Sequence, residues 1–108
     1  MNENKKTERK NLDEITNVCL AAYPGDIPST RMCIIQEEFK QGFEFMKQYP
    51  KSVTIFGSAR LSPETDMYKR VTLLAEKIAM AGYAVVTGGG HGIMAAANKG
   101  ANLGGGHS

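Results

Sequence analysis

The sequence predicts an α/β domain with a Rossmann-like parallel sheet, preceded by an N-terminal helical extension. Two short β-branched runs, residues 53–56 and 84–87, are separated by a segment with helical periodicity. A Gly-rich stretch follows the second run and leads into another helical segment, residues 93–103. Strands that alternate with helices favour a parallel sheet. Only two strands are present, and the glycines at 104–106 stand where a third would be due. We therefore expect a truncated form of the fold.

The first 50 residues predict a lead and two helices. Residues 1–10 are charged, which favours a disordered lead, and residues 11–50 form the helical extension. The extension starts with a helix over 12–22 and continues after an extended Pro28 with a helix over 31–48, capped by Ser29 or Thr30. The second helix carries an apolar stripe, which we expect to pack on the body of the protein or on a partner subunit. The stripe consists of Met32, Ile35, Phe39, Phe43 and Met46.

Residues 51–108 are expected to form a partial Rossmann-like nucleotide-binding domain. Between its two strands, Ser62 and Pro63 predict the start of a helix, with the serine as N-cap and the proline in the first turn. Gly82 stands where the C-terminal cap of that helix belongs. The helix therefore connects the two strands as a crossover.

Composition and charge exclude several classes of function. The net charge is +2, and the first ten residues already supply it, so no basic face for nucleic acid is expected. No apolar run approaches the ~20 residues that a membrane span needs, so we expect a soluble, cytoplasmic protein without a membrane partner. Cys19 and Cys33 do not have the spacing of a metal site. One disulfide is formally open to them, but without a secretion signal two reduced thiols are the favoured interpretation.

The strongest local feature is the Gly-rich loop of residues 88–92. Eight of the 12 glycines lie between residues 88 and 106, and this clustering predicts a site. Glycines let an anion approach the backbone amides, and the following helix directs its free N–H groups and positive dipole end to the same place. The alternative is a tight strand-to-helix turn that simply needs glycines. The loop matches neither the G-x-G-x-x-G fingerprint nor the P-loop, which disfavours NAD or ATP binding by those routes.

A second loop, residues 57–60, follows the first strand at the same edge of the predicted sheet, where ligand crevices form. Ser58 can donate a hydrogen bond to a phosphate and Arg60 can pair with it; the alternatives are a local cap and a solvated side chain. His91 is interpreted as a positioning or solvated residue. Beyond residue 82 the sequence has no Asp or Glu, so no carboxylate for acid–base chemistry follows the loop.

These segments resemble the LOG (Lonely Guy) family, the cytokinin-activating nucleoside-monophosphate phosphoribohydrolases, some of which carry the label lysine decarboxylase. The matching stretches are residues 53–60, 81–90, 92–94 and 96–101, and residues 38–43 resemble the N-terminal extension of the longer bacterial members. Many relatives have proline where this chain has His91. The resemblance implies hydrolysis of the N-glycosidic bond of an AMP-like nucleoside 5′-monophosphate. It also implies that no metal or organic cofactor is needed, and that the full-length protein is a homo-oligomer.

Catalytic residues cannot be assigned from this resemblance, because the family's glutamate and its assisting arginine belong to a signature expected beyond Ser108. We therefore expect the chain alone to lack useful activity. Two alternatives stay open: a non-catalytic nucleotide- or phosphate-binding module, and a truncated product that does not fold stably, because two strands make a poor sheet. The candidate nucleotide- and phosphate-binding residues are Gly57, Ser58, Arg60, Gly88, Gly89, Gly90, Gly92, Ile93 and Met94.

Overall fold

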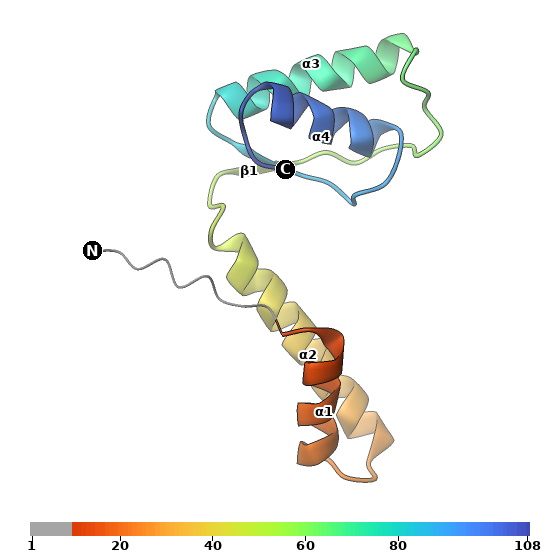
Figure 1. Cartoon of the computed structure of the whole chain (residues 1–108), viewed down its shortest axis with the longest axis vertical. Helices are drawn as coiled ribbons and strands as arrows, with labels where there is room; N and C mark the ends of the chain where they lie inside the picture. Colours follow the sequence, from red (N-terminus) through yellow and green to blue (C-terminus); the bar gives the residue numbers. More distant parts are fainter. Residues whose placement is uncertain (1–9) are drawn as a thin grey trace, which may run out of the picture. The chain divides into compact units, whose positions relative to one another are not determined.

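The structure is a computed structural model that describes residues 10–108 (Figure 1). The predicted disordered lead therefore lies outside the described residues, except for Lys10. The chain divides into two compact units, Met1–Gln48 and Tyr49–Ser108. In the first unit the structure has helices α1 (Leu12–Ala22) and α2 (Ile27–Met46). The second unit contains β1 (Ser52–Thr54), α3 (Asp66–Met80), β2 (Ala84–Val86) and α4 (Ile93–Leu103).

Both helices of the first unit begin at side-chain caps. Asn11 and Glu14 form a capping box at α1. At α2 the cap is Asp26, which accepts hydrogen bonds from the hydroxyl and the backbone N–H of Ser29, and these two bonds lower the pKa of Asp26. The predicted Ser29 or Thr30 cap was therefore wrong. Pro28 lies in the first turn of α2, not in an extended segment, because a missing N–H is harmless there.

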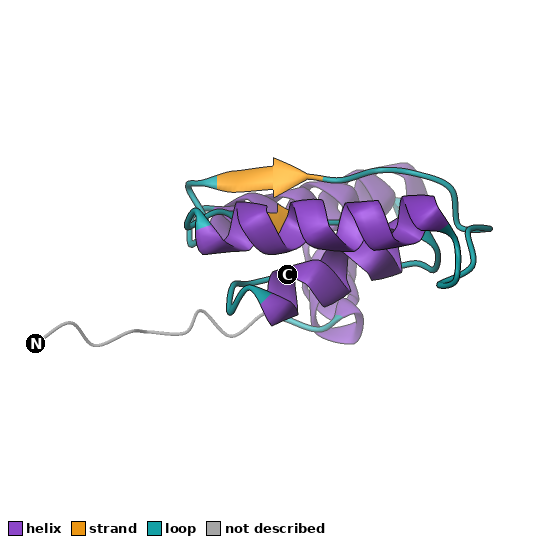
Figure 2. Cartoon of the chain, turned by 90° about the horizontal axis from the view of Figure 1, so that it is seen from above, coloured by secondary structure: helices purple, strands orange, loops and turns teal. Residues whose placement is uncertain are grey.

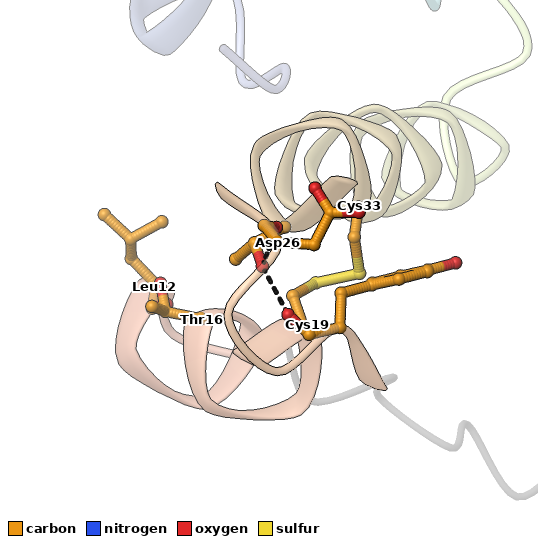
Figure 3. The surroundings of a disulfide bond; sticks show 7 residues. Leu12, Thr16, Cys19, Asp26 and Cys33 are labelled. Atoms are coloured by element: carbon orange, nitrogen blue, oxygen red, sulfur yellow. Dashed lines mark hydrogen bonds between the residues drawn. A yellow bond between two sulfur atoms is a disulfide. The ribbon is translucent and has the colours of Figure 1, made fainter. Parts of the chain in front are cut away.

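A disulfide joins the two helices, which corrects the prediction of two reduced thiols. Cys19 of α1 and Cys33 of α2 are bonded, with their Cα atoms 5.7 Å apart, within the usual range for a disulfide (Figure 3). The turn at residues 23–26 folds α2 back along α1, so residues near the end of one helix face residues near the start of the other. The prediction was argued from the cellular compartment, and it took no account of this geometry.

Four of the five residues of the predicted apolar stripe of α2 are exposed, and the fifth, Met46, is half-buried. The residues Met32, Ile35, Phe39 and Phe43 are 45–66% exposed, and the rings of Phe39 and Phe43 lie 6.2 Å apart. A shallow groove runs along this face between Ile35, Phe39 and Phe43 and the stems of neighbouring polar residues. The only fully buried residue of α2 is Thr30, on the side of α1. Within the first unit, the stripe is therefore not part of the core.

The second unit is a small α/β body. Strands β1 and β2 are parallel, with Val53 opposite Val85, and helices α3 and α4 lie side by side against them (Figures 1 and 2). Val85 is buried in the core, and the other members of the core are all alanines. This core consists of Ala75, Ala79, Val85, Ala97 and Ala101, with Ile55, Val71 and Ile78 packed against it.

Small residues let α3 and α4 approach closely. A Cβ built on Gly100 would overlap the carbonyl oxygen of Thr72 and lie 2.8 Å from Cβ of Ala75. Gly104 and Gly106 have the same relation to Ala79, at 2.9 and 2.7 Å. These glycines therefore serve packing between helices, whereas their position in the Gly-rich part of the sequence suggested a ligand site.

The start of α3 differs from the prediction, whereas its C-terminal end agrees with it. Thr65 is the N-cap, and the segment from Ser62 to Thr65 is a turn closed by a hydrogen bond from the Thr65 N–H to the Ser62 carbonyl. Ser62 is therefore not the cap. Gly82 directly follows the C-cap and has a φ of 88°, as a glycine in this position does in many helices.

Residues 106–108 run beside β2 on the side away from β1. The N–H of Val85 donates to the carbonyl of His107 at 2.9 Å, and the rings of His107 and Tyr49 lie 5.5 Å apart. Among the helices of residues 10–108, none is long and apolar enough to cross a bilayer.

Candidate functional site

The loop after β1 and the loop before α4 meet, as expected from their shared edge of the sheet. The N–H of Ile93, the first residue of α4, donates to the carbonyl of Ser58 at 3.0 Å. Ile93 also packs on Gly57, where an added Cβ would lie 2.7 Å from the isoleucine side chain. The predicted residues Gly57, Ser58 and Ile93 thus form one contact that joins the two loops.

Gly92 is required by this contact. It is buried, has a φ of 67°, and a Cβ there would overlap the Ser58 carbonyl oxygen and approach Ala59. Residues other than glycine rarely adopt such a φ. Any side chain at this position would therefore push the two loops apart.

Gly88 and Gly90 are explained by the side chain of Met94. A Cβ at Gly88 would lie 3.1 Å from the Met94 sulfur, and one at Gly90 would lie 2.7 Å from its terminal methyl group. The thioether therefore lies against both glycines. A side chain at either position would require the flexible end of Met94 to move.

Gly89 is different from the other glycines of the loop. Its φ is 73°, but an added Cβ would meet nothing within 4 Å. It is also exposed, so its side of the loop opens to solvent. Its own N–H donates to the hydroxyl of Thr87 at 3.1 Å.

The loop and the first turn of α4 present a series of unused backbone donors. Within residues 10–108, no acceptor is found for the loop N–H groups at Gly88, Gly90, His91 and Gly92, nor for those at Met94 and Ala95 in the first helical turn. The N–H of Ile93 is taken by Ser58, so this predicted residue contributes its contact with the first loop. Unused N–H groups in a Gly-rich turn at a helix N-terminus are the donors that bind anions.

The first loop adds two polar side chains. Ser58 accepts the N–H of Arg60 on its side-chain oxygen at 3.1 Å, which leaves its own O–H to donate elsewhere. Ser58 and Arg60 are both exposed. The Ser58 hydroxyl therefore supports a local turn, as the local-cap alternative expects, and whether it also binds a ligand stays a prediction.

The pair formed by Thr87 and Asn98 was not predicted from the sequence. The Thr87 hydroxyl lies 3.1 Å from the Asn98 side-chain oxygen and so links the end of β2 to α4. No motif marks this pair. The one available signal was the helical position of Asn98, which lies one and a half turns after the loop, on the half-buried side of α4.

The three carboxylates of the second unit lie outside the Gly-rich loop and outside α4. Glu64 bonds the Ser62 hydroxyl in the turn before α3, and Asp66 is exposed in the first turn of α3. Glu76 belongs to the face of α3 that packs on the C-terminal half of α4, because its backbone is the neighbour of Gly100 and Gly104.

The SLOG cluster4 family matches residues 50–108, which is more than half of the chain and includes both loops. Among curated proteins, none matches the chain. The SLOG clusters include LOG-like Rossmann-type proteins, so the match confirms the resemblance that the Gly-rich segments indicated. It also agrees with a nucleotide-related fold for the α/β unit. The chain belongs to the SLOG cluster4 family.

Proposed function

We propose that the two joined loops, residues 57–60 and 88–92, bind the 5′-phosphate of a nucleoside monophosphate such as AMP. The observation that carries the proposal is the set of unused N–H groups in the Gly-rich loop and the first turn of α4. A phosphate placed there would accept several charge-assisted hydrogen bonds at the positive end of the helix dipole. Family membership supports the proposal, because this is a nucleotide-related fold.

The donors have separate roles in this proposal. The N–H groups of residues 90–92 and of Met94 and Ala95 bind the phosphate oxygens, and the Ser58 hydroxyl adds a donor from the first loop. Arg60 is exposed and carries the positive charge of its loop. It pairs with the phosphate from the solvent side.

The specific reaction that the LOG resemblance implies is cleavage of the N-glycosidic bond to give a free base and ribose 5-phosphate. That reaction passes through an oxocarbenium-like ribose and uses a carboxylate to handle water and the leaving base. Glu64 is bonded to the Ser62 hydroxyl, Glu76 lies where α3 packs on α4, and no carboxylate follows the loop, which favours the second candidate, a nucleotide-binding module without chemistry. We accordingly propose the binding step for this chain, and hydrolysis where a carboxylate is supplied.

A pair of matched glycine variants tests the binding proposal. Gly89 and Gly105 have φ values of 73° and 71°, and a Cβ at either would meet nothing within 4 Å. Alanine at either position is strained by its positive φ, by about 1–2 kcal/mol, but only Gly89 lies in the phosphate loop. We expect Gly89→Ala to weaken AMP binding at least tenfold by calorimetry, and Gly105→Ala to leave it unchanged.

Titration with adenosine, which lacks the phosphate, is the control for the ligand. We expect the Gly89 variant to bind adenosine as the unaltered chain does. Equal AMP affinity in the unaltered chain and in Gly89→Ala would contradict the proposal. So would the same loss of affinity in both variants, since that would trace the effect to strain.

A further inference from the structure

The hydroxyl of Thr87 is both a donor and an acceptor, and its single hydrogen is used. It accepts the N–H of Gly89 at 3.1 Å and lies 3.1 Å from the side-chain oxygen of Asn98. A carbonyl oxygen can only accept, so the hydrogen of the hydroxyl points to Asn98. The Thr87 hydroxyl therefore accepts from Gly89 and donates to Asn98, and in this way it connects the Gly-rich loop to α4.

These bonds act on the part of the loop that has the least other support. Gly88, Gly90 and Gly92 are held by contacts with Met94 or with the first loop, whereas nothing lies within 4 Å of a Cβ at Gly89. A hydroxyl that accepts the N–H two residues ahead is a common way to fix a turn. The bond to Asn98 then ties this turn to the helix whose first N–H groups are unused.

We propose that Thr87, oriented by Asn98, is a positioning residue for the phosphate site; the inference rests on the function proposed above. The hydroxyl has no hydrogen left for a ligand, and the N–H of Gly89 is occupied. Thr87 therefore acts through the loop: it holds residue 89 in its left-handed conformation and so fixes the direction of the N–H groups that follow. The ligand it serves is the phosphate monoester of the proposed function, because a row of unused N–H groups at a helix N-terminus favours an anion.

Two substitutions at residue 87 separate this role from packing. Thr87→Val keeps the size and the β-branch but removes the hydroxyl, so the Gly89 N–H and the Asn98 oxygen both lose their partner. Thr87→Ser keeps the hydroxyl and removes a methyl group. We expect the valine variant to bind AMP about 5–10-fold more weakly, which corresponds to about one hydrogen bond. The serine variant should restore binding to within about twofold of the unaltered chain.

Amide exchange gives a readout that a purely structural role would not move. In the ¹⁵N-labelled chain without ligand, we expect Thr87→Val to speed exchange of the Gly89 N–H severalfold, while the core amides of Ala97 and Ala101 keep their rates. A role confined to packing predicts the reverse pattern, with general destabilisation and an unchanged AMP affinity below the melting temperature.

The outcomes distinguish the two proposals. If the unaltered chain binds AMP and Thr87→Val binds it equally well, the positioning role is wrong and the proposed function stands. If the unaltered chain binds no AMP, the proposed function fails and this inference fails with it. A loss of affinity that serine restores, together with faster exchange at Gly89, supports both.

Discussion

Reduction of the Cys19–Cys33 disulfide should open the helical hairpin of the first unit and leave the second unit intact. The bond closes a loop with a sequence separation of 14. In the chain-entropy description, a loop of this length stabilises by about 3 kcal/mol. Few side chains besides the disulfide stabilise the hairpin, since within its described residues Ile15, Cys19 and Thr30 are the buried ones. Burial of the isoleucine is worth about 1.5–3 kcal/mol, so the disulfide contributes at least as much as the largest apolar contact.

The length of α1 reinforces this estimate. Isolated helices of fewer than about 12–15 residues are marginal in water, and α1 has 11 residues. Once the disulfide is cut, α1 has no independent reason to stay folded. A loss of about 3 kcal/mol corresponds to a roughly 100-fold larger population of the opened hairpin.

Limited trypsin digestion with mass spectrometry measures that population at separate sites. Arg31 lies in α2 beside the disulfide, and Lys77 in α3 is an internal control in the second unit. When opening is fast relative to cleavage, the rate follows the open population. We expect a phosphine reductant to accelerate cleavage after Arg31 by one to two orders of magnitude and to leave Lys77 unaffected.

The double variant Cys19→Ser, Cys33→Ser, without reductant, should reproduce the reduced pattern, which excludes an effect of the reductant itself. Identical rates after Arg31 in the oxidised and reduced chain would refute the reasoning, because they would mean that α1 and α2 hold together without the bond. Equal acceleration at both sites would also refute it, since the disulfide would then stabilise the whole chain.

Three further outcomes are expected. Gly100→Ala should lower the free energy of unfolding of the second unit by about 1–3 kcal/mol, because the added Cβ overlaps the α3 backbone. Gly42→Ala, whose Cβ lies in open space, should not lower the free energy of unfolding. Denaturant titration measures both variants. Phe39→Asp should leave helix content unchanged by circular dichroism but lower the mass of any assembly by light scattering, and an unchanged mass would show that the exposed stripe is no interface. The chain should release no adenine from AMP by chromatography; turnover that is lost in Asp66→Asn would contradict this expectation.

Local patterns predicted most of the elements. The β-branched runs at 53–56 and 84–87 correspond to β1 and β2, and the helix expected over 93–103 has the observed bounds of α4. These segments combine a clear apolar period with Gly or Pro at their ends, so nearby residues decide their structure. The contact between the two loops could also be predicted from the sequence, because parallel strands bring their carboxyl ends to one edge of the sheet.

Pairings between distant residues could not be predicted in the same way. The disulfide depends on how the turn at 23–26 orients two helices, and the Thr87–Asn98 bond depends on the angle at which α4 returns over β2. Neither angle is encoded in a single window of sequence. The start of α3 was misplaced for a related reason: both Ser62 and Thr65 can cap, and the turn between them uses the Ser62 carbonyl, which leaves the cap to Thr65.

The glycines show why clustering in sequence is a weak guide to a site. The structure divides the eight that follow residue 87 by what a side chain would meet: α3 for Gly100, Gly104 and Gly106, Met94 for Gly88 and Gly90, and the first loop for Gly92. Only Gly89 and Gly105 meet nothing, and both have positive φ. Packing against backbone and core atoms therefore explains Gly92, Gly100, Gly104 and Gly106 without a ligand. A phosphate at this site is instead favoured by the unused N–H groups of residues 90–92 and of the first turn of α4.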